Sequence, residues 1–157
     1  MFRISRLTDY GTMLLVYLAQ HEGRLCSASD VAQGTHVAQP TAQKLLKVLA
    51  KTGLVDSVRG AEGGYRLART PESINAAEIL DALEGPIAIT ECSTLESHCE
   101  LEPMCQVGDA WQKINNAIRL ALTDISLADL EHPPHAFPPL NVDRIVHAGS
   151  LHEVESK

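Results

Sequence analysis

The spacing of hydrophobic residues changes from helical to strand-like within the first half of the chain, and this change constrains the fold most. Apolar residues recur at helical intervals in residues 8–20, which predicts a first helix. A capping box at Ser27 opens a second, short helix that Gly34 is expected to end. Pro40 suits the first turn of a third helix, and Gly53 lies just beyond its end.

Two short strands are predicted next, at residues 54–59 and 65–69, with a glycine-rich turn at 60–64 between them. A helix-turn-helix followed by a basic hairpin is the arrangement of a winged helix. In that arrangement the third helix enters the major groove of DNA, and the hairpin reaches the backbone or the adjacent minor groove.

The second half of the chain predicts two further helices. The first is capped by Ser73 or Asn75 and stopped by Gly85. The second begins near Asp109 and carries an apolar stripe at helical spacing, formed by Trp111, Ile114, Ile118, Ala121, Leu122 and Ile125. Such a stripe needs a covering surface, which a second copy of the chain supplies most simply; packing on residues 8–20 of the same chain is the alternative.

The predicted fold is therefore mainly α with a small β-hairpin: a winged helix-turn-helix domain plus a long C-terminal dimerisation helix. Residues 1–85 form the DNA-binding domain and residues 86–108 a cysteine-containing loop. Residues 109–130 form the dimerisation helix, and residues 131–157 a flexible tail rich in proline. No apolar run is long enough to span a bilayer and no signal peptide is recognisable, so a cytoplasmic protein is expected.

Charge is divided unevenly along the chain, although the net charge is -7. Residues 1–70 contain nine lysines and arginines against five acids, whereas residues 71–157 contain four against fifteen. A basic first half suits contact with a polyanion, because binding depends on the local field rather than on the total charge. Chance clustering of charge would give the same division.

The candidate DNA-binding residues lie on the third helix and the hairpin. Lysines at helical spacing on the face opposite the core would contact phosphates, and polar residues near the helix N-terminus would reach base edges. In the hairpin, arginines flank glycines that let the backbone approach a phosphate closely. A solvated lysine face and an ordinary glycine-rich hairpin are the alternatives. The candidates are Thr41, Gln43, Lys44, Lys47, Arg59, Gly60, Gly63, Gly64 and Arg66.

Three cysteines, Cys92, Cys99 and Cys105, lie within fourteen residues in a C-x6-C-x5-C pattern, and Cys26 stands apart. The spacing is wider than that of paired zinc knuckles, and soft thiolates suit an iron-sulfur cluster. Zinc completed by His98 and Asp109 is one alternative, and redox-active or buried structural thiols are another. No local motif indicates catalysis, so an enzyme is not expected.

Several of these segments resemble the Rrf2 family of bacterial regulators, which includes IscR-like, NsrR-like and RirA-like branches. They are residues 3–10, the stretch from 53 to 67, and the cysteine loop before a long helix. The segment 83–92 is most similar to the branch that regulates the SUF operon for iron-sulfur cluster assembly. The resemblance covers residues 1 to about 130 and implies a winged-helix homodimer, joined through the long helix, on a two-fold-related double-stranded DNA operator.

By this resemblance Cys92, Cys99 and Cys105 are cluster ligands, of either a 2Fe-2S or a 4Fe-4S cluster. The histidine of the IscR-like pattern is replaced by Gly108, whereas Asp9 matches the aspartate that NsrR-like proteins supply from the partner subunit. Asp9 is therefore the expected fourth ligand, although a plain helix-start acid suits the same position. The expected function is cluster-dependent transcriptional regulation of the SUF assembly genes, as a repressor that responds to cluster, iron or redox status. The alternatives are a nitric-oxide or iron-responsive repressor, a zinc-stabilised DNA-binding protein and a small redox protein.

Overall fold

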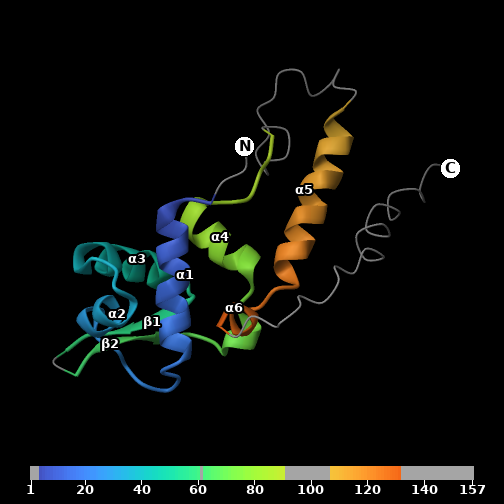
Figure 1. Ribbon diagram of the computed structural model, residues 1–157. Coiled ribbons are helices and arrows are strands. Elements are labelled where there is room, and N and C mark those ends of the chain that lie inside the picture. Colours follow the sequence, from blue (N-terminus) through green and yellow to red (C-terminus); the bar gives the residue numbers. More distant parts are fainter. Residues whose placement is uncertain (1–3, 61, 91–106, 132–157) are drawn as a thin grey trace.

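The computed structural model describes residues 4–60, 62–90 and 107–131. Within them, six α-helices, one short 3-10 helix and two strands follow one another along the chain (Figure 1). The prediction of a mainly helical fold with a small hairpin is confirmed. The elements are α1 (Arg6–Ala19), α2 (Ala28–Thr35), α3 (Gln39–Lys51), β1 (Val55–Val58), β2 (Gly64–Leu67), η1 (Pro71–Ser73), α4 (Ala76–Glu84), α5 (Gly108–Thr123) and α6 (Leu127–Glu131).

Side-chain caps fix the starts of the helices. The Ser27 hydroxyl accepts a hydrogen bond from the Asp30 amide and the Asp30 carboxylate accepts one from the Ser27 amide, so the predicted capping box is present. Asn75, rather than Ser73, caps α4. The prediction that α2 ends at Gly34 is wrong: the helix continues to Thr35, and His36 supplies the left-handed residue with φ of 57°.

The hairpin is a two-stranded antiparallel sheet in which Val55 pairs with Leu67 and Val58 with Gly64. A further pair of backbone hydrogen bonds joins β2 to the residue that precedes the α2 cap. The Cys26 amide donates to the Tyr65 carbonyl at 2.9 Å, and the Tyr65 amide donates to the Cys26 carbonyl at 2.8 Å. These two bonds fix the position of the hairpin relative to the start of α2.

The hydrophobic core lies between α1, α2, α3 and the base of the hairpin. Helix α1 runs through its centre and packs against α2, α3, α4 and α6 (Figure 1). Because the helix spacing of 3.6 residues brings positions three and four apart onto one face, the buried leucines of α1 and α3 face each other. The fully or almost fully buried residues of this core include Leu14, Leu15, Leu18, Val31, Leu45, Leu46, Leu49, Leu54, Ile74 and Leu127.

Helix α5 stands apart from the head and packs against α4 (Figure 1). It ends at Thr123, and Ser126 begins the separate helix α6 by accepting a hydrogen bond from the Asp129 amide. The single helix expected over residues 109–130 is therefore interrupted. The alternative in which the apolar stripe packs on α1 of the same chain is not seen among the described residues, where α5 packs against α4. Trp111 and Ile114 of the stripe remain 39% and 44% exposed.

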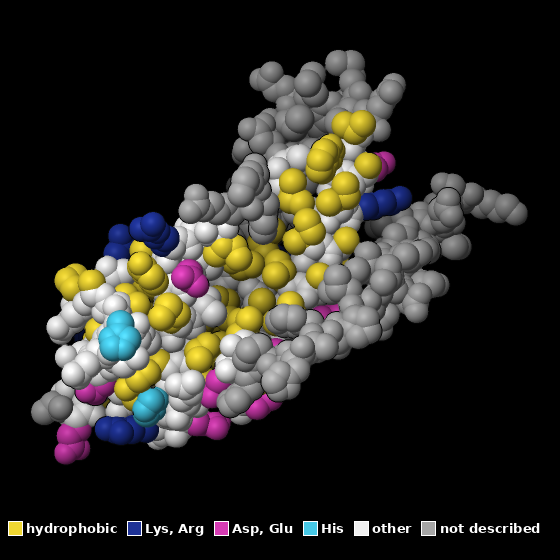
Figure 2. Space-filling view, viewed as in Figure 1, with side chains coloured by type: hydrophobic (Ala, Val, Ile, Leu, Met, Phe, Trp, Pro, Cys, Tyr) yellow, Lys and Arg dark blue, Asp and Glu magenta, His cyan; other side chains and the backbone are white. Residues whose placement is uncertain are grey.

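Hydrophobic side chains continue from α5 across the face that it shares with α1 and α4, as Figure 2 shows. The exposed large hydrophobic residues of α1 on the described part of the chain are Leu7 and Met13, and Ile4 precedes them. Among the described helices, none is both long and apolar enough to cross a membrane.

Candidate nucleic-acid interface

Helix α3 has one face in the core and one in solvent. Ala42, Leu45, Leu46 and Leu49 are buried and hold the helix against α1. On the opposite face Gln43, Lys44 and Lys47 are exposed, and Thr41 in the first turn is half-buried. The four α3 residues predicted to meet DNA therefore lie on the outer side of the helix or at its edge, where they are open to a ligand.

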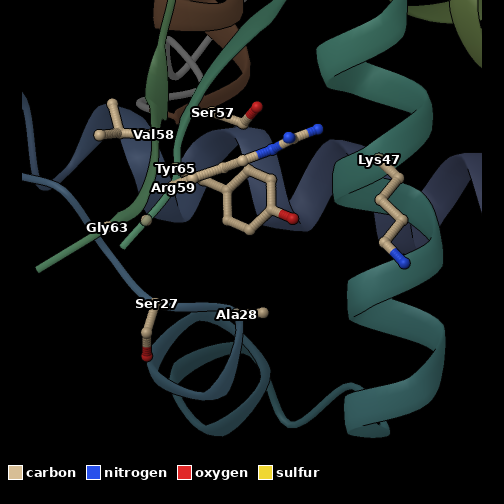
Figure 3. Close-up of a pocket in the computed structure, with 9 residues that line it drawn as sticks. Ser27, Ala28, Lys47, Ser57, Val58, Arg59, Gly63 and Tyr65 are labelled. Carbon is tan, nitrogen blue, oxygen red and sulfur yellow. The ribbon is translucent and has the colours of Figure 1, made fainter. Parts of the chain in front are cut away.

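A groove lies between α3, the N-terminus of α2 and the hairpin, and we call it the wing groove. It has a volume of about 480 Å³. Lys47 enters it from α3, while the side chains of Arg59 and Tyr65 extend from the hairpin toward α3 (Figure 3). Its lining residues are Ser27, Ala28, Lys47, Ser57, Val58, Arg59, Gly63, Gly64 and Tyr65.

The chemistry of the wing groove suits an anion. It combines the two cationic side chains of Lys47 and Arg59 with the hydroxyls of Ser57 and Tyr65. Neither cation forms an ion pair within the part of the chain that the structure describes. Charge-assisted hydrogen bonds from such groups to phosphate oxygens are the usual means by which proteins hold a nucleic-acid backbone.

Close packing explains why glycine occupies two positions of the hairpin, and the sequence did not reveal this packing. A Cβ atom on Gly64 would lie 2.7 Å from the carbonyl oxygen of Cys26, and one on Gly63 would lie 2.3 Å from the carbonyl oxygen of Val58. The hairpin packs so closely on itself and on the α2 start that side chains are excluded. The same closeness brings the Arg59 side chain and the α2 N-terminus to one groove.

Arg66 and Gly60 are the predicted hairpin residues that do not line the wing groove. Side chains of a strand alternate between its two faces, so Tyr65 faces the groove and Arg66 faces away from it. Arg66 pairs with its cross-strand neighbour Asp56 at 3.4 Å, and both side chains are about half exposed. Exposed pairs of this kind contribute about 0.2–1 kcal/mol to stability.

Five residues that line the groove were not among those predicted from the sequence: Ser27, Ala28, Ser57, Val58 and Tyr65. The capping box at Ser27 marked the start of a helix, and the position of that start beside the hairpin follows only from the Cys26–Tyr65 backbone pairing. Period-two alternation from Tyr65 could have placed Ser57 and Tyr65 on one face, since they are directly paired across the hairpin.

Of the four predicted cluster ligands, only Asp9 lies among the described residues. Cys92, Cys99 and Cys105 lie outside the described residues. Asp9 is exposed in the first turn of α1, and its carboxylate forms no hydrogen bond or ion pair with any described residue. It lines a shallow groove with Met13, Tyr17 and His36, among other residues.

Cys26 is separate from these candidates. It is 2% exposed, and desolvation by burial raises the pKa of its thiol. A thiol with a raised pKa is mostly protonated at neutral pH and is a poor nucleophile or metal ligand. Cys26 is therefore a buried residue of the hydrophobic core.

The comparison with protein families decides the identity. Residues 4–133 match the family model described as "Rrf2: Iron-dependent Transcriptional regulator". The chain belongs to the Rrf2 family. Members of this family are DNA-binding transcriptional regulators rather than enzymes, and they are generally dimeric. The resemblance that the sequence motifs indicated is confirmed, and so is the expectation of a winged-helix regulator.

Several individual relatives resemble this Rrf2 protein along most of its length. It is 30% identical over 130 residues to the HTH-type transcriptional regulator NsrR of Bacillus licheniformis, over 82% of this chain and 91% of that one. The structure of CymR, the global cysteine regulator of B. subtilis, superposes with a TM-score of 0.65 at 32% identity and covers 85% of this chain and 99% of its own. IscR of T. potens superposes with a TM-score of 0.61 at 31% identity, covering 91% and 96%.

Proposed function

We propose that this Rrf2 regulator binds a two-fold-related DNA operator through α3 and the wing groove, under the control of an iron-sulfur cluster. The observation that carries the DNA-binding part is the convergence of Lys47, Arg59 and the start of α2 on one open groove beside the exposed face of α3. Thr41, Gln43 and Lys44 would face the major groove from α3, and Arg59, Gly60, Gly63 and Gly64 would follow the adjacent backbone or minor groove.

A homodimer joined through α5 is the second part of the proposal. Trp111 and Ile114 are exposed on α5, and Leu7 and Met13 are exposed on α1. Figure 2 shows hydrophobic side chains that continue from α5 across the face it shares with α1 and α4. Contiguous apolar surface of this kind is characteristic of an interface. Two heads related by a two-fold axis would then match an operator of the same symmetry.

The donor set fits an iron-sulfur cluster. Cys92, Cys99 and Cys105 supply three thiolates, the ligands that iron-sulfur clusters prefer. Asp9 supplies an exposed carboxylate that forms no hydrogen bond or ion pair with any described residue. A ligand that is donated to the partner subunit's cluster must be accessible in this way. When bound, the cluster would supply a cross-link between two subunits that is sensitive to oxidants, nitric oxide and iron supply. The description of the family as iron-dependent supports a site of this kind.

The target genes follow from the same reasoning. The resemblance of residues 83–92 to the SUF branch supports control of iron-sulfur assembly genes, for which cluster occupancy is a direct measure of demand. Family membership alone does not select the signal, since one similar structure is a global cysteine regulator. Iron or nitric oxide sensing by the same cysteines is the second candidate, favoured by the similarity to NsrR.

Purification without oxygen, followed by assay of iron and acid-labile sulfide, tests the cofactor. We expect a brown protein that loses its visible absorption in Cys92→Ala and has an altered spectrum in Asp9→Ala. Asp109→Ala is the matched control, because Asp109 is also an acid in the first turn of an exposed helix. A colourless protein that contains zinc, and loses it in Asp109→Ala, would replace the cluster by the zinc alternative.

A further inference from the structure

Helix α4 ends in a carboxylate that is bound to the start of α1. The Glu84 Oε1 atom accepts a hydrogen bond from the Ser5 amide at 3.0 Å and a short one from the Thr8 hydroxyl. The side chains of Ser5 and Thr8, together with the Ser5 amide, lower the pKa of Glu84, so the carboxylate is ionised at neutral pH. One turn further on, Leu83 fills the space that a side chain at Gly11 would need, since a Cβ there would lie 2.5 Å from Leu83 Cδ1.

The residues that follow Glu84 are held from the other side by α5. The Ile87 amide donates to the Asp81 carboxylate at 3.4 Å, and the Ile89 amide donates to Oδ1 of Asn115 at 3.3 Å. Asn115 is 7% exposed and is the buried polar residue of α5. Arg119 donates to both Asp81 oxygens, at 3.1 and 2.6 Å. Residues 86–90 therefore lie in a hydrogen-bonded frame made by α4 and α5.

Helix α1 connects this frame to the DNA-binding head. Its centre is buried in the core, where Leu14 and Leu15 are 0% exposed. Further along, the Tyr17 ring lies where a side chain at Gly34 of α2 would be, with Cε2 2.0 Å from the position of that Cβ. Since α1 is a continuous helix from Arg6 to Ala19, a shift of its first turn displaces its contacts with α2 as well.

We propose that Glu84 is a positioning residue that couples residues 86–90 to the first turn of α1, and so to the orientation of the DNA-binding head. This inference depends on the proposed function, because residues 86–90 lead directly to Cys92 and the first turn of α1 contains Asp9. Through Glu84, both candidate ligand segments meet at one carboxylate within a single subunit. A change at either segment would be passed to the other and to α2.

The alternative is that Glu84 only stabilises the fold. Ser5 already caps α1, because its hydroxyl accepts from the Thr8 amide at 3.3 Å, so α1 keeps a cap without Glu84. Glu84→Ala removes the acceptor and leaves the helix start otherwise intact. Glu84→Gln keeps an oxygen at Oε1, which receives both hydrogen bonds, and is the conservative rescue. Glu72→Ala removes an exposed glutamate of η1 and is the control for charge.

The first test is amide hydrogen exchange in the cluster-free full chain. We expect exchange in the peptide covering residues 5–12 to rise about tenfold in Glu84→Ala, with wild-type exchange in Glu84→Gln and Glu72→Ala. The second is the ratio of operator affinities with and without the cluster. We expect it to fall to within about twofold of unity in Glu84→Ala, while cluster content and melting temperature stay close to wild type.

An unchanged affinity ratio in Glu84→Ala, or loss of the ratio in Glu84→Gln and Glu72→Ala alike, overturns the coupling role and leaves the proposed function standing. Unchanged exchange of residues 5–12 in Glu84→Ala overturns it as well. A wild-type protein with no cluster, or with equal affinities in its two forms, overturns the proposed function and this inference together. The wild-type measurement thus separates the two failures.

Discussion

Substitution of Lys47 tests the wing groove quantitatively. Lys47 is exposed on α3 and shares the groove with Arg59, where both would neutralise operator phosphates. Neutralising one phosphate fewer makes the slope of log K against log salt less negative by about 0.9. A dimer carrying Lys47→Ala neutralises two phosphates fewer, one in each subunit, so its slope should be about 1.8 units less steep than that of the wild type.

The same number gives an affinity that is easy to measure. Between 50 and 200 mM salt the concentration rises fourfold, and a slope difference of about 1.8 then corresponds to a factor of about 12. Over this range the operator affinity of the wild type should therefore fall about 12-fold more than that of Lys47→Ala. Fluorescence anisotropy with a labelled operator at four or five salt concentrations measures both slopes. The assay can use the form of the protein that binds more tightly, whichever that is, because the slope reports the phosphates neutralised and not the switch.

Lys113→Ala is the matched control, because Lys113 is an exposed lysine of α5, away from the wing groove. It changes the net charge by the same amount and should leave the slope within about 0.3 units of wild type. Equal slopes for wild type and Lys47→Ala, or equal changes in the two variants, would refute the reasoning. In that case a general field rather than a groove contact would govern the affinity.

Three further predictions address the hairpin, the dimer and the acid limit. Gly64→Ala places a Cβ against the Cys26 carbonyl and should break the two backbone hydrogen bonds between Cys26 and Tyr65, at a cost of about 1–3 kcal/mol in folding free energy. The melting temperature should fall by roughly 2–12 °C, and an unchanged melting temperature would contradict the close packing. Ile114→Glu places a charge on the exposed apolar face of α5 and should shift sedimentation from dimer to monomer, whereas a stable dimer would move the interface elsewhere. Glu84 and Asp30 have pKa values lowered by hydrogen bonds, from Ser5 and Thr8 and from Ser27 respectively. The folding stability that the two ionised carboxylates contribute is complete above their ordinary pKa values of 4.5 and 3.8, and it is lost as the pH falls through the lowered pKa values. Glu84→Gln should therefore flatten the acid side of a plot of denaturant midpoint against pH.

The local fold was predictable because each element carries its own signal. The capping box at Ser27 and the proline at position 40 mark helix starts, and the change to a period of two marks the hairpin. Such signals depend on neighbouring residues only. These signals gave the wrong end for α2, because His36 rather than Gly34 adopts the left-handed conformation that ends the helix.

The break between α5 and α6 shows a second kind of failure. The apolar stripe continues through Ile125, so periodicity alone predicts one helix over residues 109–130. The structure ends α5 at Thr123 because backbone pairing competes: the Ala76 amide donates to the Ile125 carbonyl, and the Leu127 amide donates to the Ile74 carbonyl. Those bonds join segments some fifty residues apart, and no local pattern contains them.

The candidate site was predictable in its charges and not in its geometry. Lys44 and Lys47 follow from helical spacing, but which hairpin arginine reaches the groove depends on the strand register. That register places Arg59 in the groove and Arg66 beside Asp56 on the other face. The contacts of Glu84 were not predictable, because its partners, Ser5 and Thr8, lie almost eighty residues earlier in the sequence.

The most direct test of the account is one titration done twice on the same protein. Labelled DNA from upstream of the iron-sulfur assembly genes is titrated without oxygen with cluster-loaded protein, and again after the cluster has been removed by oxidant and chelator. We expect the two dissociation constants to differ by roughly 5- to 150-fold, the usual range of coupling between two sites. Equal dissociation constants would contradict cluster-dependent control. The chain would then be a DNA-binding protein whose cysteines do not affect its affinity for the operator.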